Sequence, residues 1–124
     1  MTEESVPPLI ARARVLHYAI VDETVRYTPK GKVFVNDEEI GAVPRLAIVR
    51  NLVDDDILLF HCDEAWTCLG VSGKGGIEDV MADANARYDG LAGKWHVTPY
   101  SDTDFARALL GRAAIVILPS YRKR

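Results

Sequence analysis

Residues 57–71 read Ile-Leu-Leu-Phe-His-Cys-Asp-Glu-Ala-Trp-Thr-Cys-Leu-Gly-Val, and this stretch decides the fold. Two apolar runs, residues 57–60 and 66–71, flank a polar corner at residues 63–65. Short apolar runs on either side of a polar corner are typical of a β-hairpin. A glycine-rich turn from Gly70 to Gly76 then joins the hairpin to an amphipathic segment. The stretch therefore predicts a hairpin that leads directly into a helix.

The segment after the glycine-rich turn has apolar residues at helical spacing. They are Ile77, Val80, Met81, Ala84, Tyr88 and Leu91. Glu78 and Asp79 stand in the first turn, where negative charge is favourable beside the positive end of the helix dipole. The pattern predicts one long amphipathic helix whose apolar stripe covers one face of a sheet.

The N-terminal part of the chain has a second helical pattern. Pro7 and Pro8 offer a helix start, because proline is tolerated in the first turn. The apolar spacing that follows predicts a helix over residues 8–20. Valine, tyrosine and isoleucine are frequent at the end of this segment, so a strand is the alternative there.

Short strands are predicted before and after the hairpin. Residues 32–35, 40–43 and 46–52 have strand composition and are separated by turn signals. Near the C-terminus, residues 94–97 predict an edge strand, and Ser101 with Asp104 resembles a capping box before a short helix at 105–110. The apolar run 113–118 predicts a buried strand, with a helix as the alternative.

Together these elements predict the α+β class in a single domain of residues 1–124, with frayed ends at 1–7 and 120–124. The expected architecture is an antiparallel β-meander of about three to five strands packed against the one long amphipathic helix. An N-terminal helix and a short C-terminal helix plus strand complete it. The chain has 124 residues, 48% of them hydrophobic, which is enough for one core.

Charge and composition exclude several classes of partner. The net charge is −3, and both nucleic acid and anionic membrane select a positive footprint. The order helix, strands, helix resembles the double-stranded-RNA-binding domain in topology only, because Glu78 and Asp79 stand where that family places lysines. The acidic N-terminus lacks the pattern of a secretory signal, and no apolar run is long enough to span a membrane. We therefore expect a cytoplasmic protein that binds neither nucleic acid nor membrane.

Three groups of residues have the chemistry of a site. Residues 70–76 fail the phosphate-binding P-loop pattern, because Cys68 and Gly75 occupy positions that need glycine and a hydroxyl residue. His61, Cys62 and Asp63 have the residue types of a base, a nucleophile and an acid, but His61 and Cys62 point to opposite faces of a regular strand. His61 and Asp63 can share a face, and Cys68 lies opposite either His61 or Cys62, depending on register, so a nucleophilic pair needs His61 with Cys68. Five residues separate the two cysteines, and this spacing is a poor match for structural zinc. We expect no cofactor and no metal.

No cluster in the sequence meets the geometric needs of catalysis, and the acidic turns then favour a binding function. Complementary charge steers a basic partner toward such turns, and the edges of an antiparallel sheet are open to strand addition or dimerisation. The expected function is therefore that of a small non-catalytic protein-binding module, of the immunity-protein or adaptor type, for a partner of basic character or a second copy. The alternative is a small enzyme or ligand binder that uses His61, Cys68 and Asp63 or the turn from Gly70 to Gly76. The predicted binding residues are Asp37, Glu38, Glu39, Asp54, Asp55, Asp56, Asp63, Glu64 and Trp66.

Overall fold

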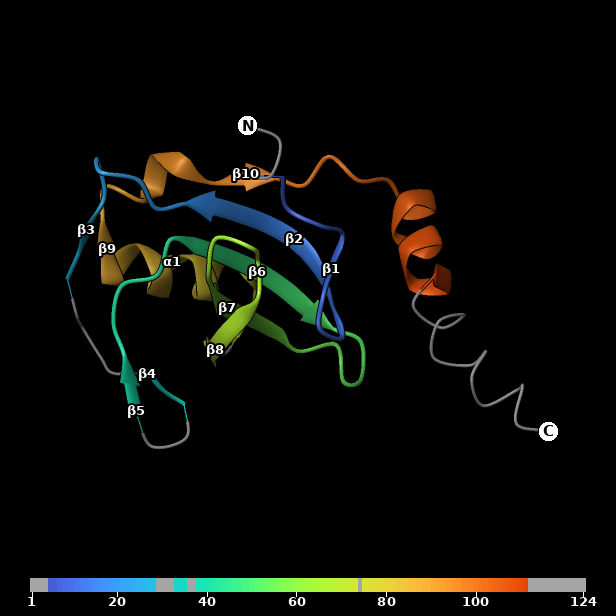
Figure 1. Ribbon diagram of the computed structural model, residues 1–124, viewed down its shortest axis with the longest axis horizontal. Helices are drawn as coiled ribbons and strands as arrows, with labels where there is room; N and C mark the ends of the chain where they lie inside the picture. The colour runs from blue at the N-terminus through green and yellow to red at the C-terminus, as the bar shows by residue number, and fades with distance from the viewer. Residues whose placement is uncertain (1–4, 29–32, 36–37, 74, 112–124) are drawn as a thin grey trace.

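A curled antiparallel sheet of six strands dominates the computed structural model, which describes residues 5–28, 33–35, 38–73 and 75–111 (Figure 1). The strand order is β1-β2-β6-β7-β8, and β10 pairs with β2 beside β1. The bounds are β1 (Leu9–Ile10), β2 (Ala13–Ile20), β6 (Arg45–Asn51), β7 (Ile57–Cys62), β8 (Cys68–Ser72) and β10 (His96–Val97). The curl gives the sheet the form of a half-barrel, and every pairing in it is antiparallel.

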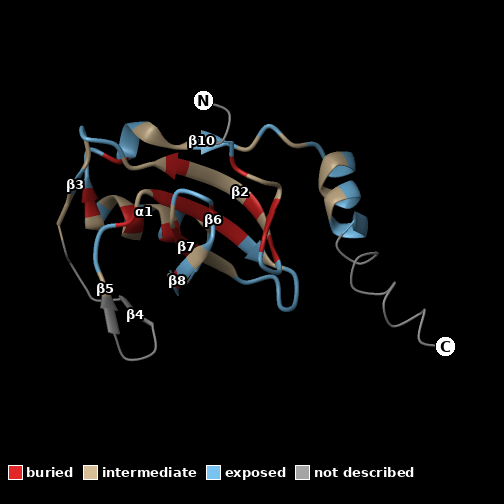
Figure 2. Ribbon diagram, in the orientation of Figure 1, coloured by how far each residue is buried: buried red, intermediate tan, exposed pale blue. Residues whose placement is uncertain are grey.

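Each face of this sheet has its own apolar core. Five consecutive residues of the central strand β6, from Arg45 to Val49, are buried, which is expected of a strand that is covered on both faces. Ala47 and Val49 face one core, in which Phe60 and Trp66 also lie. Leu46 and Ile48 face the other core, beneath the helix α1 (Ile77–Arg87). Figure 2 shows the buried residues concentrated along these central strands.

Smaller elements surround the sheet. β3 (Arg26–Tyr27) pairs with β9 (Tyr88–Asp89), and β4 (Val33–Val35) pairs with β5 (Glu38–Ile40). A 3-10 turn, η2 (Ala92–Lys94), precedes β10. A second helix covers residues 102–111 and stands apart from the sheet in Figure 1. It is attached through Arg14, which forms an ion pair with Asp102 at 2.6 Å and lies over the ring of Phe105 at 4.5 Å.

The predicted architecture is wrong in its balance of sheet and helix. The chain forms a six-stranded curled sheet with two short α-helices among its described residues, rather than one long helix on a meander of three to five strands. α1 has 11 residues and ends at Arg87, and the last members of its predicted apolar stripe, Tyr88 and Leu91, lie beyond it. Both are nevertheless buried in the core beneath the helix, so their spacing indicates that they are buried but not that they are helical. The coarser prediction, an antiparallel sheet accompanied by helices, is confirmed.

The N-terminal helix predicted over residues 8–20 is also wrong, because this segment forms β1 and β2. A bulge lies between Val15 and His17, where the register of β2 on β6 shifts. Val15 and Tyr18 consequently face the same core although they are three residues apart, which imitates helical spacing. The strand alternative at this segment was the correct one.

Several local predictions are confirmed. The hairpin forms as β7 and β8, and β10 forms within residues 94–97. The capping box is present, since the Asp104 N–H donates to Ser101 Oγ and the Ser101 N–H donates to Asp104 Oδ2. The predicted strand at 113–118 lies outside the described residues. Within those residues, the structure has no helix with the length and apolar character needed to cross a membrane.

Candidate functional site

Two acidic turns contain predicted binding residues: residues 54–56 precede β7, and residues 63–64 lie between β7 and β8. These two turns lie near opposite ends of one strand, β8. Cys62 is opposite Cys68, so β8 begins beside the turn that contains Asp63 and Glu64. Leu59 is opposite Ser72, so β8 ends beside the start of β7, which residues 54–56 precede. We define the β8 surface as the exposed residues along this line: Asp54, Asp55, Asp56, Glu64, Leu69 and Val71.

Two apolar side chains are exposed between the acidic turns. Leu69 is 40% exposed and Val71 is 48% exposed. β8 is the last strand in the hydrogen-bonded order of the sheet as far as the described residues show, although β4 lies close to it. Exposed aliphatic side chains next to charged turns are common on surfaces that bind other proteins. Sequence reasoning missed Leu69 and Val71, because the bulge between His61 and Cys62 disturbs the alternation that would have placed them.

The turn between β6 and β7 has a defined backbone. Asp54 Oδ1 accepts a hydrogen bond of 3.0 Å from the Asp56 N–H, and the Asn51 N–H donates to the Asp56 carbonyl at 2.8 Å. Asp55 has a φ of 65°, a left-handed conformation that aspartate tolerates better than most residues. Asp54 therefore holds the turn, while Asp55 and Asp56 carry exposed carboxylates on a fixed backbone.

The turn between β7 and β8 is built around Asp63. Its Oδ1 accepts hydrogen bonds of 2.9 Å from the N–H groups of Ala65 and Thr67. Trp66 is only 5% exposed and has a φ of 64°, and its ring packs edge-on against Tyr18 at 5.9 Å. The predicted binding residue Trp66 is thus placed in the core, and Asp63 shapes the turn, which leaves Glu64 as its exposed carboxylate.

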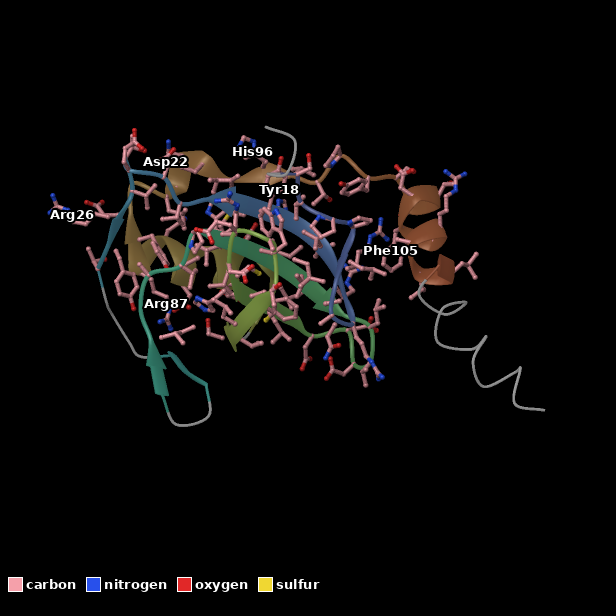
Figure 3. The ribbon with its side chains drawn as sticks, in the orientation of Figure 1. Tyr18, Asp22, Arg26, Arg87, His96 and Phe105 are labelled. Carbon is pink, nitrogen blue, oxygen red and sulfur yellow. The ribbon has the colours of Figure 1, made fainter. Side chains whose placement is uncertain are left out.

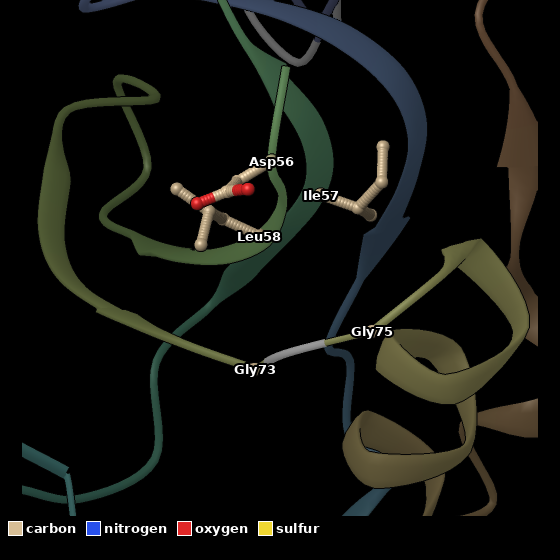
Figure 4. A pocket seen from close by; sticks show the side chains of 5 residues that line it. All are labelled: Asp56, Ile57, Leu58, Gly73 and Gly75. Carbon is tan, nitrogen blue, oxygen red and sulfur yellow. The ribbon is translucent and has the colours of Figure 1, made fainter. Parts of the chain in front are cut away.

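A pocket lies where the acidic turn and the glycine-rich turn meet. Its volume is about 300 Å³, and Asp56, Ile57, Leu58, Gly73 and Gly75 line it. Figure 4 shows the Asp56 carboxylate beside the Leu58 side chain, with the two glycines on the opposite wall. This volume is at the lower end of the range for ligand pockets and suits a side chain or a small molecule. The structure therefore brings together two segments that the sequence presented as separate candidates.

His61 is buried beneath α1 and is bonded to a hydroxyl group. Its Nε2 lies 2.7 Å from Ser72 Oγ, and the side chain is 2% exposed. Burial lowers the pKa of His61 to about 4, with a further lowering by Arg87 and an opposing effect of Asp83. His61 shares neither a face nor a strand register with Cys68, which is opposite Cys62. The candidate combination of His61, Asp63 and Cys68 is therefore not assembled into a site.

The remaining histidines lie toward the opposite edge of the sheet from β8, on β2 and β10. His96 stacks on Tyr18 with ring centroids 5.2 Å apart, and Figure 3 shows the two side by side. Burial lowers the pKa of His17, which lies in β2 opposite Ile48. Neither histidine faces a carboxylate or thiol of the described residues at hydrogen-bond distance.

The other predicted acidic triplet is only partly described. Glu38 and Glu39 belong to β5, opposite Val35 and Phe34, whereas Asp37 lies outside the described residues. β4 lies near β8, and β5, which contains Glu38 and Glu39, pairs with β4. No group of three or more metal-ligating side chains is close enough to hold an ion within the described part of the chain.

Comparison with known proteins gives no assignment: no family model, no curated protein and no solved structure matches this chain significantly.

Proposed function

We propose that the protein is a non-catalytic module that binds a protein of basic character through the β8 surface. One observation carries the proposal: the acidic turns at residues 54–56 and 63–64 flank the exposed side chains of Leu69 and Val71 on a single strand. Separated carboxylates steer a basic partner and fix its orientation, while apolar contact between them supplies most of the affinity. The net charge of −3 acts in the same direction.

The pocket at the end of β8 extends this surface. Ile57 and Leu58 supply apolar walls, and Asp56 supplies the one charged group among the described residues that line the pocket. A lysine or arginine side chain matches this combination, because its alkyl stem packs on apolar walls while its charged head meets a carboxylate. We therefore place a basic side chain of the partner in this pocket.

His61 is not suited to act as a catalytic base, and this favours a binding function over an enzymatic one. A catalytic base needs a pKa near the working pH and access to substrate. Burial lowers the pKa of His61 to about 4, and the side chain is 2% exposed beneath α1. The pocket itself favours a second candidate function, binding of a small organic cation, because its size and its carboxylate suit such a ligand as well as a side chain.

Quantitative affinity capture from the cytoplasm of the source cell, followed by mass spectrometry, tests the proposal. The surface variant carries Asp55→Asn, Asp56→Asn and Glu64→Gln, which removes three charges but keeps Asp54 and Asp63, the residues that hold the turns. The control variant carries Glu23→Gln, Glu78→Gln and Asp89→Asn, with the same change of charge at exposed positions elsewhere.

We expect a basic protein to be captured by the wild type and the control, and to be reduced about tenfold or more on the surface variant. Equal capture by both variants would show that the partner binds another face. If the captured protein is a second copy of the chain, size-exclusion chromatography gives a dimer, and the same pair of variants shows whether this edge of the sheet forms it.

A further inference from the structure

The two cysteines of the chain stand directly opposite each other across the β7–β8 hairpin. Cys62 and Cys68 are register partners, and both are free thiols. Residues opposite each other in an antiparallel pair project to the same face of the sheet. Both cysteines accordingly contact the core that contains Phe60 and Trp66, where Cys62 is a member and Cys68 packs against it.

The hydrogen bonds of the hairpin place these cysteines in the closer type of antiparallel pair. The Asp63 N–H donates to the Thr67 carbonyl at 3.0 Å, while the Thr67 N–H donates to Asp63 Oδ1, so one backbone hydrogen bond joins residues 63 and 67. The next pair outward, Cys62 with Cys68, is then a non-hydrogen-bonded pair, in which Cα atoms are about 4.5 Å apart. This spacing falls within the range that a disulfide spans, about 4.4–6.8 Å between Cα atoms.

The two thiols differ in access. Cys62 is fully buried, whereas Cys68 is partly exposed and its thiol donates to the Gly70 carbonyl at 3.4 Å. Burial raises the pKa of Cys62 to about 12, with smaller contributions from the neighbouring Cys68 and Asp63, and burial also raises the pKa of Cys68. Cys68 is therefore the thiol that an external reagent reaches first, and both thiols stay reduced until an oxidant is supplied.

We propose that Cys62 and Cys68 are a redox modification site that forms a reversible disulfide across the hairpin. The oxidant is a low-molecular-weight disulfide of the glutathione type. The Cys68 thiolate attacks one sulfur of this disulfide and releases one free thiol, which leaves a mixed disulfide on Cys68. The Cys62 sulfur then attacks Cys68 Sγ and expels the second thiol. The protein loses two protons and two electrons, and the reagent takes up both to become two thiols.

The bond would close the turn that carries Asp63, Glu64 and Trp66 at its base. This turn contributes Glu64 to the β8 surface, so oxidation would restrict one end of that surface. The disulfide itself goes beyond the proposed function and does not depend on it, since the chemistry is set by Cys62 and Cys68 alone. Intact-mass measurement of the isolated chain reports the bond, and the capture experiment reports binding, so failure of one is distinguishable from failure of the other.

The test exposes the folded, full-length chain to oxidised glutathione. Intact mass is compared with that of the variants Cys62→Ser and Cys68→Ser. We expect the wild type to lose the mass of two hydrogens, to show no thiol after denaturation, and to recover both thiols with dithiothreitol. We expect Cys62→Ser to accumulate a glutathione adduct at Cys68, since the resolving sulfur is absent, and Cys68→Ser to react far more slowly. The wild-type reaction should accelerate from pH 7 to pH 9, because burial raises the pKa of both thiols.

Two results would overturn the inference. A wild-type chain that keeps a stable glutathione adduct at Cys68 would show that Cys62 does not reach it. A wild-type chain that stays fully reduced while Cys62→Ser becomes modified would show that the reduced pair is protected rather than poised to react.

Discussion

His61 illustrates how a single buried side chain couples the fold to pH. It lies beneath α1, bonded to Ser72 Oγ at 2.7 Å, and the ion pair of Arg87 with Asp83 stands on the adjacent helix. Protonation would place a positive charge among buried groups and close to Arg87. The folded protein therefore holds His61 in its neutral form.

This arrangement predicts a loss of stability in mild acid. The pKa of His61 is about 4 in the folded chain against 6.5 in the unfolded chain, so below pH 6.5 the unfolded state binds more protons. The contribution of His61 is complete above pH 6.5 and decreases as the pH falls toward 4, by up to about 3 kcal/mol. Urea unfolding at pH 7, 6, 5 and 4.5 measures this slope.

His61→Gln removes the titrating group, so we expect a flatter dependence of stability on pH than in the wild type. An equal slope in wild type and His61→Gln would mean that another group, such as His17, carries the effect.

Tyr88 holds the loop before β6 through a buried hydrogen bond. The Val43 N–H donates to Tyr88 Oη at 3.0 Å, and both residues are buried. Tyr88→Phe leaves this N–H without its acceptor, so we expect a loss of about 1–3 kcal/mol in the free energy of unfolding. Chemical denaturation measures it. A change below about 0.5 kcal/mol would indicate that water replaces the hydroxyl group.

At the scale of elements, α1 covers its face of the sheet through a narrow stripe. Val80 and Ala84 are the fully buried residues of the helix, whereas Met81 is only partly buried. Asp79 Oδ2 accepts a hydrogen bond of 3.0 Å from the Gly76 N–H, which fixes the start of the helix. The contact of α1 with the sheet therefore depends mainly on Val80 and Ala84.

Val80→Asp should unfold the domain or lower its stability by about 4 kcal/mol, because it buries a carboxylate without a partner. Ala82→Asp is the matched control on the exposed side of the helix and should cost less than about 1 kcal/mol. The far-ultraviolet circular dichroism melt compares the two. Similar melting of both variants would mean that α1 does not pack on the sheet as described.

The helix of residues 102–111 is attached by fewer contacts. Arg14 meets both Asp102 and Phe105, and Leu110 is 69% exposed. Arg14→Ala should leave the global free energy of unfolding nearly unchanged but speed hydrogen exchange in this helix. Arg14→Lys keeps the charge but weakens the stacking on Phe105, and should give an intermediate rate. Global destabilisation by Arg14→Ala would show that the helix is part of the cooperative core.

Local patterns in the sequence predicted those elements whose signals are local. The β7–β8 hairpin, the start of α1 and the capping box at Ser101 each follow from a few neighbouring residues. β2 was mistaken for a helix because its bulge at Leu16 and its burial on both faces removed the two-residue alternation. The C-terminal end of α1 was predicted too far along the chain, because Tyr88 and Leu91 are buried by packing in the core and not as part of the helix.

The candidate site was predictable only in part, for a similar reason. The acidic turns are visible in the sequence, but their meeting at the two ends of β8 depends on strand register. The same register separates His61 from Cys68 and places Cys68 opposite Cys62. Trp66 was included among the predicted binding residues, but its backbone is left-handed and its ring lies in the core. These outcomes depend on the pairing of strands, which the hydrophobic periodicity of the sequence does not predict.

At the scale of the whole molecule, the curled sheet places the proposed binding surface at its margin. The two cores take up both faces of the central strands, which leaves β8 at the margin of the half-barrel with Leu69 and Val71 exposed. The carboxylates of the flanking turns surround this margin, and the pocket beside Asp56 opens at one end of it. We propose that a partner binds at this margin.

Hydrogen–deuterium exchange of the chain, alone and with its captured partner, tests that claim most directly. We predict slower exchange in residues 54–58 and 63–72 on complex formation, with little change in α1 or in residues 102–111. Protection confined to α1, to β10 or to residues 102–111, with the hairpin unchanged, would contradict the account and move the binding surface to another face of the molecule.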